Sequence, residues 1–299
     1  MTGFLEQLSV KVFDRWLANL VVPGLLWLCS AVLAVRLGWA HALDLRAAES
    51  LVRELLGSRS AGQAVLLVVA ALLGSAVAGL AALGLAAALR RVWTWPGRAV
   101  PVRWLRQWRR HRWNAADRDA VRHRIDALNT VEDSATTVGP EYRDAMARRD
   151  AIGLEPPERP TWIADRWFAA ELRIRRAYGL ELTVAWPRLW LVAPETTRND
   201  LTVAQSAYRK SGVTVAWAIL YGLVGLFWGP ALFVAVCLAL AGIVRAREAT
   251  GNLCELVESS CDLYGSSLAE QLKVPCPDRL TPEVGREITA QLRKKDIPG

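Results

Sequence analysis

The chain has 299 residues, of which 53% are hydrophobic and 22% are charged, and its net charge is +8. Residues 60–89 and 211–244 contain no Asp, Glu, Lys or Arg, whereas the segment between them is as charged as a soluble domain. Because about 20 apolar helical residues cross a bilayer core of about 30 Å, both runs are long enough to span a membrane. They exclude an ordinary soluble protein and predict one membrane unit and one aqueous unit, built from interleaved parts of the chain.

The beginning of the chain predicts an amphipathic helix followed by a transmembrane hairpin. Residues 1–16 carry an apolar stripe at helical spacing and are expected to form a cytoplasmic N-terminal helix. Residues 17–89 are expected to form the first hairpin, with spans at 17–35 and 61–89.

Residues 212–244 are expected to form a second hairpin with its turn at Trp228-Gly229-Pro230, because a helix does not run smoothly through Gly-Pro. The last span, 231–244, is short for a full crossing. Either Arg245 snorkels to the interface or the hairpin is partly re-entrant. The predicted fold class is all-α, with four transmembrane helices in two hairpins and an all-helical cytoplasmic domain, since no alternating apolar period indicates a sheet.

Arginines beside the second span set the predicted orientation. No acidic residue occurs between Glu54 and Asp117, so the arginines that follow residue 89 are not balanced by carboxylates. The loop between the first two spans carries both signs of charge in balance. The positive-inside rule therefore places residues 90–211 and both termini in the cytoplasm of a multi-pass protein of the cell membrane, here a bacterial inner membrane.

Residues 90–113 are rich in Arg and Trp and directly follow the second span. Tryptophan prefers the headgroup layer and arginine is attracted to anionic lipid, so this segment is expected to lie on the inner leaflet. Nucleic-acid binding is the rival interpretation and is not favoured, because the segment follows a transmembrane helix. The candidate membrane-interface residues are Arg90, Arg91, Trp93, Trp95, Arg103, Trp104, Arg106, Trp108, Arg109, Arg110, Arg112 and Trp113.

Residues 114–211 predict a cytoplasmic helical domain. A short helix is expected at 117–127 and a loop at 128–141, where Asn, Thr, Ser and Gly gather. Thr161 is predicted to cap a helix that Gly179 closes.

Residues 245–299 predict C-terminal cytoplasmic helices. Apolar residues recur at three- and four-residue spacing after Arg245, which indicates that the fourth span continues beyond the membrane as an amphipathic helix. Pro275 is expected to stop it, and Thr281-Pro282 predicts the start of a last helix.

The second span carries a row of small residues on one side. Small residues let helices approach closely in lipid. The row either packs against the other spans of the same subunit or forms a subunit interface, and the sequence favours neither. The candidate helix-packing residues are Ala71, Gly74, Ser75, Ala78, Gly79, Ala82 and Ala86.

No motif for catalysis, phosphate binding or metal binding is present, and no cofactor is predicted. The three histidines lack partners at metal spacing, and the five cysteines contain no C-x-x-C pair. Glu258 and Asp262 lie four residues apart, which is interpreted as a solvated helix face. The spans lack ionisable residues, which weakens a transporter hypothesis but leaves a pore open, since hydrophobic constrictions can gate.

The stretch PTWIADRWFAAELRIRRAYGLELTVAWPRLWLVAPE, residues 160–195, resembles an uncharacterised family of actinobacterial multi-span membrane proteins. Asp14-Arg15-Trp16-Leu17 followed by Val22-Pro23-Gly24 is similar too. The resemblance covers a small part of the chain. It implies a membrane protein and implies no activity and no site residues.

Two hypotheses follow. The first is a non-enzymatic membrane protein, a homo-oligomer whose cytoplasmic helices couple a signal or partner to a channel-like pore or a membrane perturbation. The alternative is a membrane-anchored adaptor that recruits a cytosolic protein partner and forms no pore. Both have anionic headgroups of the inner leaflet as a partner, and neither predicts nucleic-acid binding.

Overall fold

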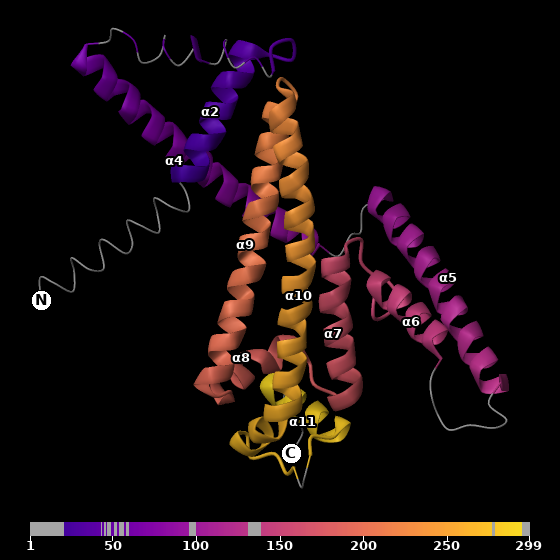
Figure 1. The fold of residues 1–299 in the computed structure, drawn as a ribbon. Helices are drawn as coiled ribbons and strands as arrows, with labels where there is room; N and C mark the ends of the chain where they lie inside the picture. Colours follow the sequence, from indigo (N-terminus) through magenta and orange to yellow (C-terminus); the bar gives the residue numbers. More distant parts are fainter. Residues whose placement is uncertain are drawn as a thin grey trace, which may run out of the picture. The chain divides into compact units, whose positions relative to one another are not determined.

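The computed structural model describes residues 21–42, 60–95, 100–130, 139–276 and 279–294, with residues 44, 46, 49, 50, 53 and 57 between them. Over these residues the regular secondary structure is α-helical and no β-strand occurs (Figure 1). The prediction of an all-α fold is therefore confirmed. The helix predicted at 1–16 lies outside the described residues.

The chain divides into two compact units, each made from two separate parts of the sequence. Unit 1 comprises Met1–Arg90 and Arg209–Arg245, and unit 2 comprises Arg91–Tyr208 and Ala246–Gly299. Two long helices, α9 (Glu195–Gly225) and α10 (Gly229–Gln271), each contribute residues to both units. The two runs without charged residues fall in unit 1.

Unit 1 contains α2 (Val22–Leu37) and nearly all of α4 (Ala61–Trp93), together with the parts of α9 and α10 on either side of their connecting turn. Pro23 lies in the first turn of α2, where its missing N–H is not needed. Gly24 faces α4 so closely that a Cβ atom there would overlap the backbone of Ser75. The absence of a side chain at Gly24 therefore allows α2 and α4 to approach.

Two tryptophans join the turn after α2 to the turn between α9 and α10. The indole N–H of Trp39 donates to the carbonyl oxygen of Leu226 at 2.9 Å, and that of Trp228 donates to the carbonyl oxygen of Ala42 at 3.0 Å. Each bond gives the polar N–H group of an indole ring a hydrogen-bond partner within the apolar unit 1. The two turns therefore lie at the same end of unit 1.

Two helices among the described residues, α4 and α10, are long and apolar enough to cross a membrane. The prediction of four spans is not confirmed. The apolar helix α2 has 16 residues, and the first predicted span begins in residues outside the described part. The apolar part of α9 is preceded by Arg209 and Lys210, so the helix as a whole is not uniformly apolar.

The large apolar side chains of α4 and α10 point outward. In their most apolar windows only 17% and 22% of the residues are buried, respectively. A core helix of a soluble protein would be mostly buried, so this exposure fits contact with lipid. Examples of exposed side chains are Leu66, Leu73, Val77, Leu80, Phe233, Val236 and Leu240.

Unit 2 has its own apolar core. It contains α5 (Val100–Thr130), α6 (Pro140–Ile152), α7 (Trp162–Tyr178), α8 (Leu182–Val192) and α11 (Pro282–Leu292), with the first part of α9 and the second part of α10. α5 and α6 pack along each other (Figure 1). The core gathers buried side chains of the other helices, among them Ile174, Leu189, Leu201, Val257, Leu268 and Ile288.

The predicted helix ends of unit 2 are confirmed where they depend on local chemistry. The Thr161 side chain accepts a hydrogen bond from the N–H of Ala164 at the start of α7. Gly179 ends α7 in the left-handed region with φ of 64°. Thr281 caps α11 by accepting from the N–H of Val284, with Pro282 in the first turn.

The limits of the short helix predicted at 117–127 are wrong. The boundary at 113/114 and the short helix at 117–127 both fall inside α5, which is one helix of 31 residues. The sequence changes there from Arg/Trp-rich to mixed charge, but no Gly or Pro occurs, so nothing stops the helix. The predicted continuation of the last span is confirmed, because residues 231–244 lie at the beginning of α10, which has 43 residues and continues past Arg245 to Gln271.

Candidate functional site

The first half of α5 has an outward face and a packed face. Trp104 and Trp108 lie four residues apart, so they share one side of the helix. Their exposed fractions are 69% and 47%, which is high for tryptophan. The Arg112 guanidinium lies over the Trp108 ring at 5.0 Å, a cation–π arrangement. The neighbouring Arg103 and Arg110 are exposed, and Arg106 is half-buried.

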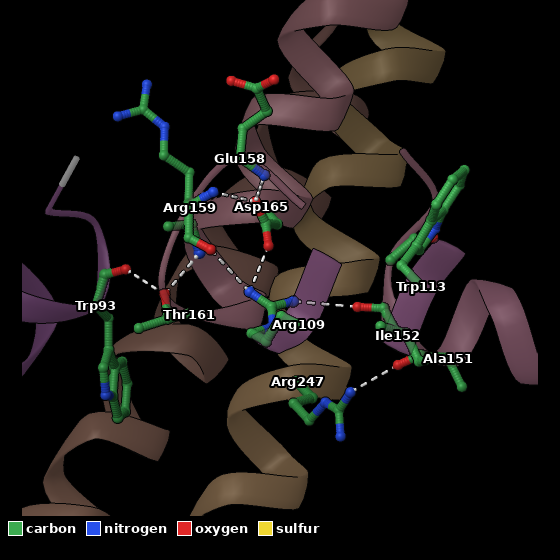
Figure 2. A network of polar contacts seen from close by, with 12 residues as sticks. Trp93, Arg109, Trp113, Ala151, Ile152, Glu158, Arg159, Thr161, Asp165 and Arg247 are labelled. Atoms are coloured by element: carbon green, nitrogen blue, oxygen red, sulfur yellow. Dashed lines mark hydrogen bonds and ion pairs between the residues drawn. The ribbon is translucent and has the colours of Figure 1, made fainter. Parts of the chain in front are cut away.

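Arg109 and Trp113 lie on the packed face of α5. The guanidinium of Arg109 forms an ion pair with Asp165, and it donates to the carbonyl oxygens of Arg159 at 3.0 Å and of Ile152 at 3.1 Å (Figure 2). The Trp113 indole N–H donates to the carbonyl oxygen of Gly153 at 2.7 Å. Both residues were predicted at the membrane interface, and they instead fix α5 to the rest of unit 2.

Asp165 lies in the first turn of α7 and is 5% exposed. Besides the ion pair with Arg109, its carboxylate accepts hydrogen bonds from the backbone N–H groups of Glu158 at 2.9 Å and Arg159 at 2.6 Å. Burial raises the pKa of the Asp165 carboxyl, and the Arg109 guanidinium and the two N–H groups oppose this rise. The carboxylate thus orders the segment before α7 as well as α5.

A second arginine holds the end of α6. Arg247 of α10 donates to the carbonyl oxygen of Ala151 at 2.9 Å (Figure 2). The Arg247 guanidinium also lies over the Trp162 ring at 4.8 Å. Burial and the nearby positive charge of Arg109 lower the pKa of Arg247. Arg109 and Arg247 together give the end of α6 donors for carbonyl groups that have no partner inside the helix.

Acidic residues occur on α5 only in its second half, and two of them contact α6. Arg148 contacts Asp119 at 3.1 Å, and Arg149 contacts Asp117 at 3.3 Å. The Arg149 guanidinium also lies 5.8 Å from the centroid of the Trp113 ring. The first half of α5, residues 100–116, contains no carboxylate and keeps its positive charge.

The candidate interface residues near the end of α4 differ in their exposure and in their contacts. The Trp93 carbonyl oxygen accepts a hydrogen bond from the Thr161 hydroxyl at 2.6 Å (Figure 2). Arg91 and Trp95 are exposed. The Arg90 side chain instead lies beside Gly212 in unit 1.

The predicted small-residue row of α4 contacts other helices of unit 1. Ser75, Ala78, Gly79, Ala82 and Ala86 are buried, and Ala71 and Gly74 are half-buried. Ala78 and Ala82 pack in one cluster with Trp217 of α9, and a Cβ atom at Gly74 would lie 3.0 Å from the Leu28 side chain of α2. These residues therefore have packing partners within their own chain.

The sequence reasoning missed a nearly buried ion pair between α7 and α10. Glu258, interpreted as solvated, is 14% exposed and forms an ion pair with Arg166 at 2.6 Å. Asp262 is exposed, as interpreted, and accepts a hydrogen bond from the Tyr178 hydroxyl at 2.8 Å. Burial together with Asp262 raises the pKa of Tyr178 to about 12. The signal available in the sequence was a carboxylate on the same helical face as buried apolar residues, here Cys254 and Cys261.

No group of His, Cys, Asp and Glu in the part of the chain that the structure describes is arranged to hold a metal ion. Cys254 and Cys261 are buried, and burial raises the pKa of each thiol to about 12. At neutral pH they are protonated and unreactive.

Comparison with protein-family models, with curated proteins and with solved structures finds no match to this chain.

Proposed function

We propose that the protein is a non-enzymatic, membrane-anchored adaptor of the bacterial inner membrane. Unit 1 is the anchor, and unit 2 is a cytoplasmic helical module that recruits a cytosolic protein. The observation that carries this proposal is the division of the chain into an apolar unit and a charged unit that are joined through α9 and α10.

The surface of unit 1 supports its role as anchor. Large apolar side chains such as Leu73 and Phe233 are 64% and 71% exposed, which is unfavourable in water. The small residues, in contrast, are turned inward. A lipid bilayer is the surrounding in which a helix unit with large apolar side chains outside and small residues inside is stable.

The chemistry of unit 2 supports its role as an aqueous module. It has a compact apolar core, capped helices and ion pairs such as Arg148–Asp119 on its surface. The arginines that follow α4 support a cytoplasmic position for residues 90–211 and for both termini.

The second candidate function is coupling of a cytoplasmic event to a pore in an oligomer. This function is favoured by the continuity of two helices, since α9 runs from unit 2 into unit 1 and α10 runs from unit 1 into unit 2, each without a break. The packing of the small-residue row within one chain removes the strongest reason to assign that row to a subunit interface. We therefore rank the adaptor first.

Membrane retention and site-specific crosslinking in cells test the adaptor. The tagged full chain is expected to stay in the membrane fraction after alkaline carbonate washing. With p-benzoylphenylalanine at Leu191 or Leu263, exposed residues of unit 2, illumination is expected to give discrete adducts with cytosolic proteins. The matched position Phe233 in unit 1 is expected to give none. Release by carbonate, or adducts of the chain with itself alone, would contradict the adaptor.

A leakage assay separates the two candidates. Vesicles that contain the purified chain and a small entrapped dye are expected to retain the dye if the chain is an adaptor. Leakage that grows with the amount of protein, together with an oligomer in detergent, would replace the adaptor with the pore.

A further inference from the structure

We infer that the outward face of the first half of α5 binds the anionic phospholipid surface of the inner leaflet. We define this face as the i, i+4 row of Trp104, Trp108 and Arg112 with the flanking Arg103 and Arg110, all of which are exposed. The inference deepens the proposed function and rests on it, because it requires unit 2 to be cytoplasmic. It assigns to unit 2 a membrane contact of its own, separate from the apolar helices of unit 1.

The two tryptophans of this face have no place in the core of unit 2. Other tryptophans of the unit, such as Trp186 and Trp190, pack against that core. Trp104 and Trp108 remain 69% and 47% exposed although each carries a large apolar ring. An indole ring with an N–H group is suited to the headgroup layer, where one part of the ring is apolar and the other is hydrated.

The charge of the face selects the kind of lipid. Residues 100–116 contain no carboxylate, and Arg109, the buried arginine of this stretch, is paired with Asp165. Its exposed arginines therefore place unpaired positive charge on both sides of the two tryptophans. Arg112, which lies over the Trp108 ring, places its positive charge directly beside the ring that would enter the interface. Anionic phospholipids attract this positive charge, whereas zwitterionic lipids do not.

The packed face of α5 keeps the outward face in position. Arg109 and Trp113 bond to Ile152 and Gly153, and Arg109 also pairs with Asp165, so the helix cannot rotate about its axis without breaking buried polar contacts. A face held in one orientation binds without the cost of ordering its backbone first.

The position of α5 in the chain favours lipid over nucleic acid. Residues 94–99 alone separate α5 from α4, one of the two helices that can cross a membrane. A short linker gives the membrane surface a high effective concentration at α5. A polynucleotide, which arginines and tryptophans could also contact, would have to compete with that surface.

A spin label on the outward face measures the contact. p-Acetylphenylalanine at His111, an exposed residue three positions after Trp108, carries a nitroxide without disturbing the five cysteines. The full chain is reconstituted in nanodiscs of phosphatidylcholine alone or with phosphatidylglycerol. The expected result is that phosphatidylglycerol lowers the accessibility of the label to a water-soluble nickel chelate and raises its accessibility to oxygen. The same label at Ala147, exposed on α6, is the control and is expected not to change.

Two variants identify the residues responsible. Arg103→Gln/Arg110→Gln/Arg112→Gln is expected to abolish the effect of phosphatidylglycerol, because each arginine near an anionic surface contributes about a fivefold change in binding. Trp104→Ser/Trp108→Ser is expected to reduce the oxygen accessibility of the label. Neither variant removes a contact of Arg109 or Trp113, so the melting temperature is expected to remain that of the parent.

Three outcomes would overturn the inference. The first is equal accessibility of the label to the nickel chelate in both kinds of nanodisc. The second is protection of the label from the chelate that depends on protein concentration, which would indicate contact with a second copy of the chain. The third is protection of the label that appears only when RNA or DNA is added. Each leaves carbonate resistance and the crosslinks of Leu191 and Leu263 unaffected, so failure of the lipid contact is distinguishable from failure of the adaptor.

Discussion

Arg166 of α7 and Glu258 of α10 form an ion pair of 2.6 Å, and their side chains are 10% and 14% exposed. The half-exposed Arg173 also contacts Glu258, at 3.2 Å. Removing one member of a nearly buried pair leaves an uncompensated charge, whereas replacing both by apolar residues of similar size can be neutral.

The first prediction concerns this pair. Glu258→Ala is expected to destabilise unit 2 by about 3–5 kcal/mol, because Arg166 is left without its main partner. Arg166→Met/Glu258→Leu is expected to recover most of the loss. The melting temperatures of the detergent-solubilised variants are expected to show that the double variant is more stable than Glu258→Ala. A double variant no more stable than Glu258→Ala would contradict it.

The second prediction compares two helix caps. Thr161→Ala is expected to cost more than Thr281→Ala, because Thr161 caps α7 and donates to the carbonyl oxygen of the half-buried Trp93, whereas Thr281 caps α11 and bonds to the exposed carboxylate of Glu283. An N-cap is worth about 0.5–2 kcal/mol. Thr161→Ser keeps both hydrogen bonds and is expected to behave as the parent in thermal unfolding. Equal losses of stability in Thr161→Ala and Thr281→Ala would show that the hydrogen bond to Trp93 adds no stability.

The third prediction concerns the approach of α2 to α4. Gly24→Ala places a Cβ atom against the Ser75 backbone and is expected to destabilise unit 1 by about 1–3 kcal/mol through overpacking. The matched control is Gly84→Ala on α4, where a Cβ atom meets nothing within 4 Å. That change is expected to be neutral or stabilising, because alanine favours helices. Resistance of the membrane-embedded chain to proteolysis measures both, and equal resistance would refute the close approach.

The fourth prediction is a loss of stability at alkaline pH. Burial raises the pKa of Cys254 and Cys261 from an ordinary value of 9.0 to about 12. In the unfolded chain these thiols ionise near pH 9, whereas in the folded chain they stay protonated, so stability falls as the pH rises from about 9 towards 12. Cys254→Ala/Cys261→Ala is expected to flatten this part of the profile of melting temperature against pH. An unchanged slope in the variant would contradict the assignment.

The same thiols provide a test at neutral pH. Cys254 and Cys261 are expected to resist a water-soluble maleimide until the chain is unfolded, while the half-buried Cys276 reacts in the folded state.

Local signals in the sequence predicted local structure well. Thr161, Gly179 and Thr281 mark helix ends because a cap depends on residues within one turn of the helix. The all-α class followed from apolar spacing in the same way. The short helix predicted at 117–127 is too short for a simple reason, since the change in composition at residues 113–114 does not end a helix when no helix-breaking residue is present.

Contacts between distant segments could not be read from the sequence. Arg109 and Arg110 are adjacent arginines that the sequence does not distinguish, yet the partner of Arg109, Asp165, lies 56 positions away, and only the fold brings Arg109 and Asp165 together. The face formed by Ser75 and Ala78 could be identified from its spacing, but its partner could not, because small residues accept many apolar neighbours.

The paired bonds of Trp39 with Leu226 and of Trp228 with Ala42 have a consequence for biogenesis. The bonded residues are separated by 187 and 186 positions in the chain. At about 5–20 residues per second, the ribosome needs roughly 10–40 s between making the first member of each bond and the second. During that interval α2 and the turn after it have none of these partners. Completion of unit 1 therefore waits for translation of α9 and α10, and a truncated nascent chain offers the quality-control machinery an anchor in which α2 and α4 lack their contacts with α9 and α10.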